Sequence, residues 1–146
     1  MEVMYYEGPT QILVIGLKPG ELLLESIREA IKTHGVTSGV VVSGIGTLKT
    51  CQMHYIVHSG FPAQDIKFTM TKPLELLSVS GLIADGEPHL HITLSCGEEE
   101  VFGGHLEEGS QVLYLAEIAI LVFNELKMVR EVDEETRIKL LRKMAV

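Results

Sequence analysis

One run of the chain, residues 112–123 (VLYLAEIAILVF), is apolar on both faces if it forms an extended strand. Side chains alternate between the two faces of a strand, so each face of this run would carry an apolar row. Both faces must then be covered, as in a strand buried inside a layered fold. In a chain of 146 residues the second cover could be a partner subunit or a helix of the same chain. Glu117 stands within the run, and we expect it to hydrogen-bond across an interface or to a neighbouring strand.

Turn-forming residues divide the rest of the chain into short apolar segments, which is typical of a mostly antiparallel sheet with few helices. We expect strands at residues 10–17, 39–46, 49–58, 66–71, 74–83, 88–96, 100–106, 112–123 and 127–132. No repeat or linker interrupts the sequence, and its length suits one ordinary domain. We therefore expect a single domain over residues 1–146.

Two segments have the spacing of helices. Apolar residues recur at helical intervals over residues 21–34, and Gly35 stands where a C-terminal cap is expected. Asp133 is placed to cap a final helix over residues 134–144, which would bury Ile138 and Leu141.

Composition narrows the classes of function. The formal net charge of -8 disfavours a nucleic-acid surface, which needs clustered Lys and Arg, and disfavours binding to anionic lipid. Cys51 and Cys96 have no CxxC spacing, so we expect two buried free thiols. Residues 1–11 lack the apolar core of a signal peptide, and the run at 112–123 is too short to cross a membrane. These features predict a cytoplasmic protein with no membrane partner.

The strongest chemical signal lies in residues 88–109 (PHLHITLSCGEEEVFGGHLEEG). Residues 97–99 can form a three-residue hairpin loop closed by Cys96 opposite Glu100. This register gives one strand face an apolar set, expected in the core: Leu90, Ile92, Leu94, Phe102 and Leu106. A shift of one residue would move every side chain to the other face, so the prediction depends on the turn.

The second face of this hairpin is rich in histidine. His89 and His91 are two residues apart, so both side chains leave the same face. The expected register sets His91 opposite His105 and His89 opposite Glu107. Three imidazoles would then converge on one side of the hairpin, with a carboxylate beside them.

Neutral imidazole is a good ligand for zinc and for other divalent transition metals. We predict that His89, His91 and His105 bind such an ion and leave a fourth position for water or a solute. A bound water could ionise near neutral pH and act as a nucleophile. Glu107 is a candidate base, a candidate fourth ligand, or a hydrogen-bond partner of a ligand. The alternative is a solvated strand face that is rich in histidine.

Two further histidines, His54 and His58, are four residues apart and would share a strand face. They form a candidate second pair, and the alternative is that they are scattered surface histidines.

Two stretches, GVVVSGIGTLKTCQMHY (39–55) and EPHLHITLSCGEEEVFGGHL (87–106), resemble the PPC domain, the plant and prokaryote conserved domain. The resemblance extends over roughly residues 4–125 and rests on the His-x-His and Gly-Gly-His elements. It implies an α+β fold with an antiparallel sheet of about seven strands and a few flanking helices. It also implies a homotrimer, and a metal ion bound by the three histidines of the hairpin.

In plants this domain follows an AT-hook, whose basic Arg-Gly-Arg core enters the minor groove of DNA. The label "DNA-binding" comes from that hook. This chain contains no Arg-Gly-Arg tripeptide and its net charge is -8, so we do not expect nucleic acid as a partner.

Three functions remain open at this point. The first is a non-enzymatic, metal-containing homotrimer that binds a small molecule or a protein, and we rank it highest. The second is a zinc-dependent hydrolase or lyase that uses the three histidines, with Glu107 as base. The third is a DNA-binding protein, which rests on the family label alone.

Overall fold

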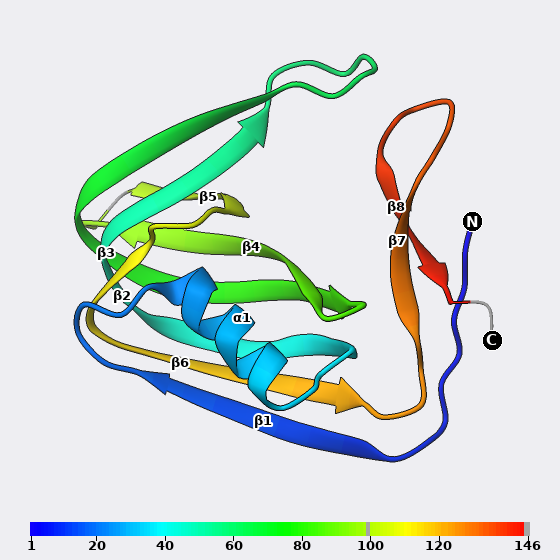
Figure 1. Ribbon diagram of the computed structural model, residues 1–146. Coiled ribbons are helices and arrows are strands. Elements are labelled where there is room, and N and C mark those ends of the chain that lie inside the picture. Colours follow the sequence, from blue (N-terminus) through cyan, green and yellow to red (C-terminus); the bar gives the residue numbers. More distant parts are fainter. Residues whose placement is uncertain (99, 145–146) are drawn as a thin grey trace.

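The computed structural model describes residues 1–98 and 100–144, which fold into a curved antiparallel sheet with one helix against it (Figure 1). The elements in chain order are β1 (Thr10–Leu17), α1 (Leu23–Thr33), β2 (Ser38–Ile56), β3 (Asp65–Ala84), β4 (Glu87–Cys96), β5 (Glu100–Leu106), β6 (Gln111–Phe123), β7 (Met128–Val132) and β8 (Lys139–Lys143). The main sheet has the order β1-β6-β2-β3-β4-β5, and β7 and β8 form a small second sheet. The mostly antiparallel fold is confirmed, but the described residues form eight strands and a single helix rather than a few.

The strands β2 and β3 are each continuous where the sequence predicts two segments. Their register shifts between Leu48 and Thr50, where Lys72 and Pro73 on β3 face a single residue on β2. Such a bulge bends a strand without ending it, and it tolerates a proline that has no N–H to donate. The two strands therefore form one long bent hairpin, whose tip projects from the rest of the sheet (Figure 1).

The bend in β2 brings its far end against β5, so that part of the sheet closes on itself. Met53 pairs with Leu106, and His54 pairs with His105. Gly104 permits this approach, because a Cβ there would lie 2.9 Å from the main-chain oxygen of His54. The closure places a residue of β2 directly beside the histidine hairpin.

The helix α1 covers one face of the main sheet. Its buried side chains are Leu23, Leu24, Ile27 and Ile31. The helix is close to its predicted bounds, and Gly35 adopts a φ of 63° just after it, as expected of a C-terminal glycine. Cys51 lies in the core beneath, and burial raises the pKa of its thiol to about 11. Both cysteines are free, as predicted, but only Cys51 is fully buried and Cys96 is partly exposed.

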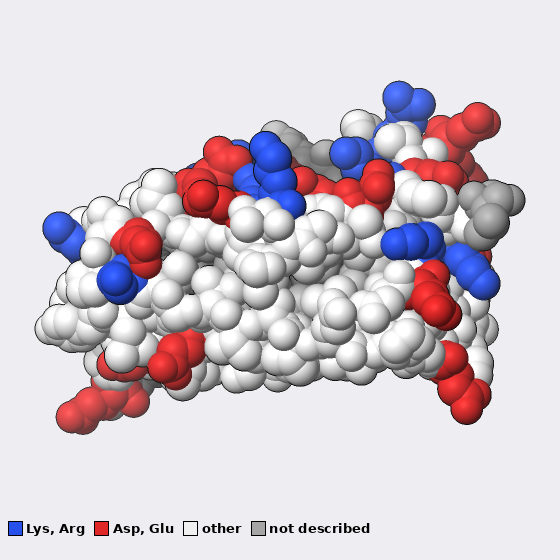
Figure 2. Space-filling model, turned by 60° about the horizontal axis from the view of Figure 1, so that its bottom comes forward, with Lys and Arg blue, Asp and Glu red and all other residues white. Residues whose placement is uncertain are grey.

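The opposite face of β6 is open in the single chain. Glu117 is exposed there and lies opposite Gly16 of β1 and Ile45 of β2. The large apolar side chains exposed on these three strands include Ile12, Val14, Val42, Ile45, Tyr114 and Leu115. A view from the side of β1 and β6 shows a broad uncharged area with Lys, Arg, Asp and Glu at its margins (Figure 2). Only one of the two apolar faces of residues 112–123 is therefore covered by this chain.

The prediction of a helix over residues 134–144 is wrong, because this part of the chain belongs to the β7–β8 hairpin. Asp133 does cap the chain, but it caps a tight turn: its carboxylate accepts hydrogen bonds from N and Oγ1 of Thr136, at 2.9 and 2.8 Å. Arg137 then adopts a φ of 61°, which a helix does not accommodate. Leu141 packs with Leu82 against a second apolar cluster, and this contact anchors the hairpin.

The helix α1 has 11 residues and falls short of the length and apolar character needed to cross a membrane, and the described part of the chain has no other helix.

Candidate metal centre

The β4–β5 hairpin has the register that the sequence predicts. His91 lies opposite His105, and Cys96 lies opposite Glu100. The residues predicted to face the core are buried or partly buried: Leu90, Ile92, Leu94, Phe102 and Leu106. Glu99, the last residue of the predicted loop, lies outside the described residues.

The structure brings the three predicted histidines together. The Nε2 atoms of His89 and His91 are 3.3 Å apart. The ring centroid of His105 lies 4.8 Å from that of His89 and 5.2 Å from that of His91. One ring nitrogen of each residue lies within 4.8 Å of the others. Two nitrogen ligands of a tetrahedral zinc ion are about 3.3–3.4 Å apart, so this donor set fits such an ion.

The electrostatics favour the neutral form of these rings. Burial, together with the nearby charges of His54, His89 and His91, lowers the pKa of His105 to about 4, although Glu107 acts to raise it. Burial also lowers the pKa of His89, and the positive charge of Arg130 adds to the effect. Neutral imidazole has a free lone pair, so both rings are in the form that binds a metal.

Glu107 does not lie opposite His89, and that part of the prediction is wrong. The strand β5 ends at Leu106, and the main-chain N–H of Glu107 instead donates to the oxygen of Gln52 on β2. His89 pairs with Leu82 of β3 on its other side. The reason is that β2 pairs with the end of β5. A longer β4–β5 hairpin would have needed the same main-chain groups.

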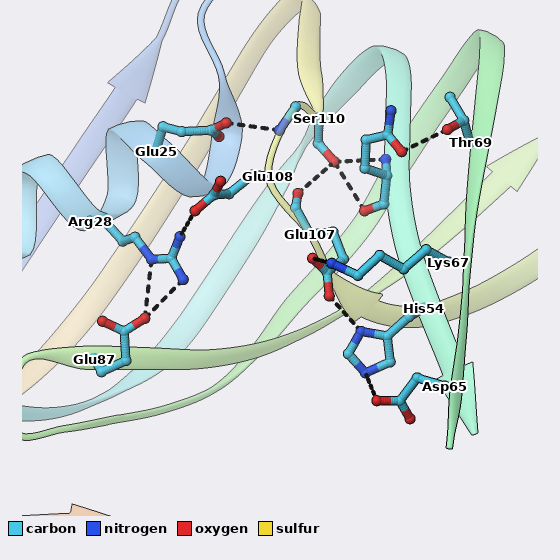
Figure 3. A network of polar contacts seen from close by, with 12 residues as sticks. Glu25, Arg28, His54, Asp65, Lys67, Thr69, Glu87, Glu107, Glu108 and Ser110 are labelled. Atoms are coloured by element: carbon cyan, nitrogen blue, oxygen red, sulfur yellow. Dashed lines mark hydrogen bonds and ion pairs between the residues drawn. The ribbon is translucent and has the colours of Figure 1, made fainter. Parts of the chain in front are cut away.

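Hydrogen bonds around the turn after β5 hold Glu107 beside β2 (Figure 3). The Ser110 hydroxyl lies 3.3 Å from the main-chain oxygens of both Glu107 and Gln52, and it accepts from the N–H of Gln52 at 2.9 Å. Glu25 of α1 accepts from the N–H of Gly109 at 2.8 Å. Helix, turn and β2 therefore act together to fix this carboxylate.

The carboxylate of Glu107 is fully engaged (Figure 3). One oxygen lies 2.6 Å from Nδ1 of His54, and the other accepts from Nζ of Lys67 at 2.7 Å. Burial raises the pKa of Glu107, but the bonds to Lys67 and His54 outweigh it and the net shift is downward. Glu107 is thus an ionised group with a hydrogen-bond partner on each oxygen, which makes it a poor base.

His54 also lies at this site, which the sequence did not predict. Its ring stacks on that of His105, with centroids 4.2 Å apart and ring planes 18° apart. Its expected partner, His58, instead lies exposed in the loop beyond β2 and accepts from the N–H of Gly60. No local pattern signals the contact between His54 and His105, because it depends on two strands that are distant in sequence.

His54, His105 and Glu107 form a second group whose ligand atoms lie within 4.8 Å of one another. A metal ion at this second group would have to displace the existing contacts of Glu107 with His54 and Lys67. The nitrogens of His89 and His91 already face each other and have no carboxylate between them. The first group is therefore the better candidate metal centre, and the His54 ring, bound to Glu107, packs on that of His105.

The fold and the histidine cluster define a small α+β domain with a candidate three-histidine metal centre. The chain matches the Plants and Prokaryotes Conserved (PCC) domain over residues 4–124, and it belongs to this family, as its motifs predict.

Several solved structures share the fold. A metal-containing protein from Archaeoglobus fulgidus is 28% identical, with a TM-score of 0.81 over 96% of this chain and 98% of that protein. A plant- and prokaryote-conserved protein from Pyrococcus horikoshii is also 28% identical, with a TM-score of 0.75 over 97% of this chain and 100% of that one. A Bacteroides thetaiotaomicron protein, provisionally called DNA-binding, is 16% identical with a TM-score of 0.81 over 95% and 96% of the two chains, which shows the fold alone.

Two curated relatives from Synechococcus, both named bifunctional protein GlmU, are 26% and 24% identical over 129 residues. The match covers 88% of this chain, but the chain spans only 20% of the length of each relative.

Proposed function

We propose that this chain is a metal-binding member of the PCC family that acts as a homotrimer, with a binding or regulatory role rather than a catalytic one. Its ion is zinc, held by His89, His91 and His105. The observation that carries this proposal is the 3.3 Å separation of the Nε2 atoms of His89 and His91, which suits two ligands of one ion. The metal-containing relative from Archaeoglobus fulgidus supports it.

Three histidines leave one position of a tetrahedral zinc ion for water or for a ligand. A hydrolase would need a free base beside that position. Glu107 is the carboxylate expected there, but it is committed to His54 and Lys67. This arrangement favours ligand binding over hydrolysis. The net charge of -8 likewise argues against a nucleic-acid partner.

The open apolar face supports the homotrimer. Val14 and Leu115 are 69% and 46% exposed on neighbouring strands, and an exposed apolar patch of this kind marks an interaction site. A further copy of the chain would cover this face, which also accounts for an apolar row on both sides of β6.

Cobalt titration tests the metal centre. Protein without a histidine tag would be stripped with a chelator and titrated with Co²⁺, whose tetrahedral complexes absorb visible light strongly. We expect an end point near one ion per chain, loss of the signal in His91→Ala, and an unchanged end point in His58→Ala, which alters an exposed loop. An end point that survives His91→Ala would rule out this ligand set.

A further inference from the structure

An open pocket of about 330 Å³ adjoins the candidate metal centre. His89 and His91 line one side of it, and Arg130, Lys139, Leu140 and Leu141 of the β7–β8 hairpin line the other. The family match ends at residue 124, so this second wall comes from a segment outside the matched domain. The volume is at the small end of the range of ligand sites, about 300–1,000 Å³.

Arg130 is held in place without an acidic partner of its own. Its guanidinium donates to the main-chain oxygens of Glu87 and Leu82, at 3.0 and 2.9 Å. The carboxylate of Glu87 is bound to Arg28, at 2.8 Å. Burial lowers the pKa of Arg130 and Glu87 raises it, but an arginine remains charged at neutral pH. Two neutral acceptors therefore fix the orientation of a cation that retains its charge.

Lys139 adds a second cation on the same side. Arg130 pairs with Leu141 and Val132 pairs with Lys139 across the hairpin, so these four side chains leave one face. Within the part of the chain that the structure describes, neither Arg130 nor Lys139 takes part in an ion pair. A positive pocket is thus present in a chain whose net charge is -8.

The rest of the wall is apolar. Leu82, Leu140 and Leu141 line the pocket, and Gly81 contributes no side chain. A fully solvated inorganic ion gains nothing from such walls, whereas an alkyl chain does. The lining therefore suits a ligand with one anionic group and a short apolar body.

We infer that this pocket binds a small aliphatic monocarboxylate. Arg130 and Lys139 hold its carboxylate at the edge of the metal centre, and Leu82 and Leu141 cover its chain. The position of the carboxylate next to a metal ion rests on the function proposed above, while the cationic pocket itself does not. Arg130 is suited to the role because its planar guanidinium binds carboxylates through paired hydrogen bonds.

Calorimetry with four probes tests the inference: acetate, butyrate, hexanoate and inorganic phosphate, each titrated into zinc-loaded and metal-stripped protein. We expect butyrate and hexanoate to bind more tightly than acetate and phosphate. We expect Arg130→Gln to weaken butyrate binding about tenfold or more, and Lys139→Gln by a smaller factor, with zinc content unchanged. The matched control is Arg142→Gln, which removes a cation from β8 but pairs with Val129 on the other face of the hairpin.

Arg130→Gln also removes bonds to the main chain, so its melting temperature must be compared with that of the native chain. Lys139→Gln carries no such risk, because Lys139 is exposed. The inference would be overturned if phosphate bound as tightly as butyrate. It would also be overturned if butyrate bound with equal affinity to the native chain, Arg130→Gln and Lys139→Gln.

The two proposals fail in different ways. Butyrate binding that depends on Arg130 in a protein that takes up no metal would retain the pocket and refute the metal centre. Zinc bound at one per chain with no carboxylate binding would refute the pocket alone.

Discussion

His54 and His105 lie directly opposite each other where β2 meets β5, and their rings stack with centroids 4.2 Å apart. Glu107 binds Nδ1 of the His54 ring at 2.6 Å, and Lys67 donates to Glu107 in turn. The ring of one candidate metal ligand therefore packs against a row of polar groups that come from β2, β3 and the turn after β5. Partners of this kind orient a ligand and tune its affinity for metal.

Removing His54 should weaken metal binding without abolishing it. We expect His54→Ala to lower zinc affinity about 10–100-fold at an unchanged stoichiometry, because His105 loses its stacking partner. Competition with a chromophoric chelator measures this change, and His58→Ala, in the exposed loop, should have no effect. Complete loss of zinc in His54→Ala together with full binding in His89→Ala would place the ion at His54, His105 and Glu107 instead.

Gly104→Ala should separate β2 from β5. The new Cβ would lie 2.9 Å from the main-chain oxygen of His54 and 3.5 Å from Cβ of Met53, so one strand must move. Overpacking of this kind costs about 1–3 kcal/mol of unfolding free energy, and zinc affinity should fall with it. Urea unfolding measures the first effect. Gly60→Ala, in the exposed loop beyond β2, is the control, since the nearest atom to its Cβ is Nδ1 of His58 at 3.6 Å, an ordinary contact. Equal destabilisation by both changes would contradict the strand closure.

The metal-stripped protein should lose stability on acidification. The pKa of His105 is about 4 in the folded chain, against an ordinary value of 6.5, so the unfolded chain binds more protons between these values. Stability is then highest above pH 6.5, falls as the pH drops towards 4, and levels off below. His105 contributes at most about 3 kcal/mol, and less because its partly exposed ring is screened by solvent.

Urea midpoints between pH 7.5 and 4 measure this loss. His105→Gln should flatten the profile, whereas His58→Gln should leave it unchanged. His89 acts in the same direction, because its pKa is also lowered, so some slope should remain in His105→Gln. An identical slope in both variants would contradict the account of His105.

A charge on the open sheet face should break the homotrimer. Val14 is 69% exposed on β1, so Val14→Glu should be tolerated by the single chain but should place a carboxylate inside the proposed interface. Light scattering at micromolar concentration should then report a monomer. Val101→Glu is the matched control, because Val101 is 66% exposed on β5, away from that face. A native chain that is itself monomeric would contradict the proposed homotrimer.

The parts of the structure that depend on neighbouring residues could be predicted from the sequence. The β4–β5 register follows from one turn and the alternation of apolar side chains, and it correctly brought His91 opposite His105. The position of Glu107 could not be predicted in the same way, because β2 approaches β5 from far along the chain and takes over the pairing after Leu106.

The C-terminal segment shows a different limit. Ile138 and Leu141 have helical spacing, and Asp133 is a good helix cap, so both local signals favoured a helix. A few apolar residues in a short segment do not distinguish a helix from a strand. The packing of Leu141 beside Leu82 and the turn around Asp133 decided the outcome, and only the fold supplies the first of these.

Metal content per chain tests the three-histidine centre most directly. Elemental mass spectrometry would be applied to the native protein and to the double variant His89→Ala with His105→Ala, both purified without a histidine tag. We expect about one zinc ion per native chain and little in the double variant. Absence of metal from both proteins, or equal metal in both, would contradict the three-histidine centre.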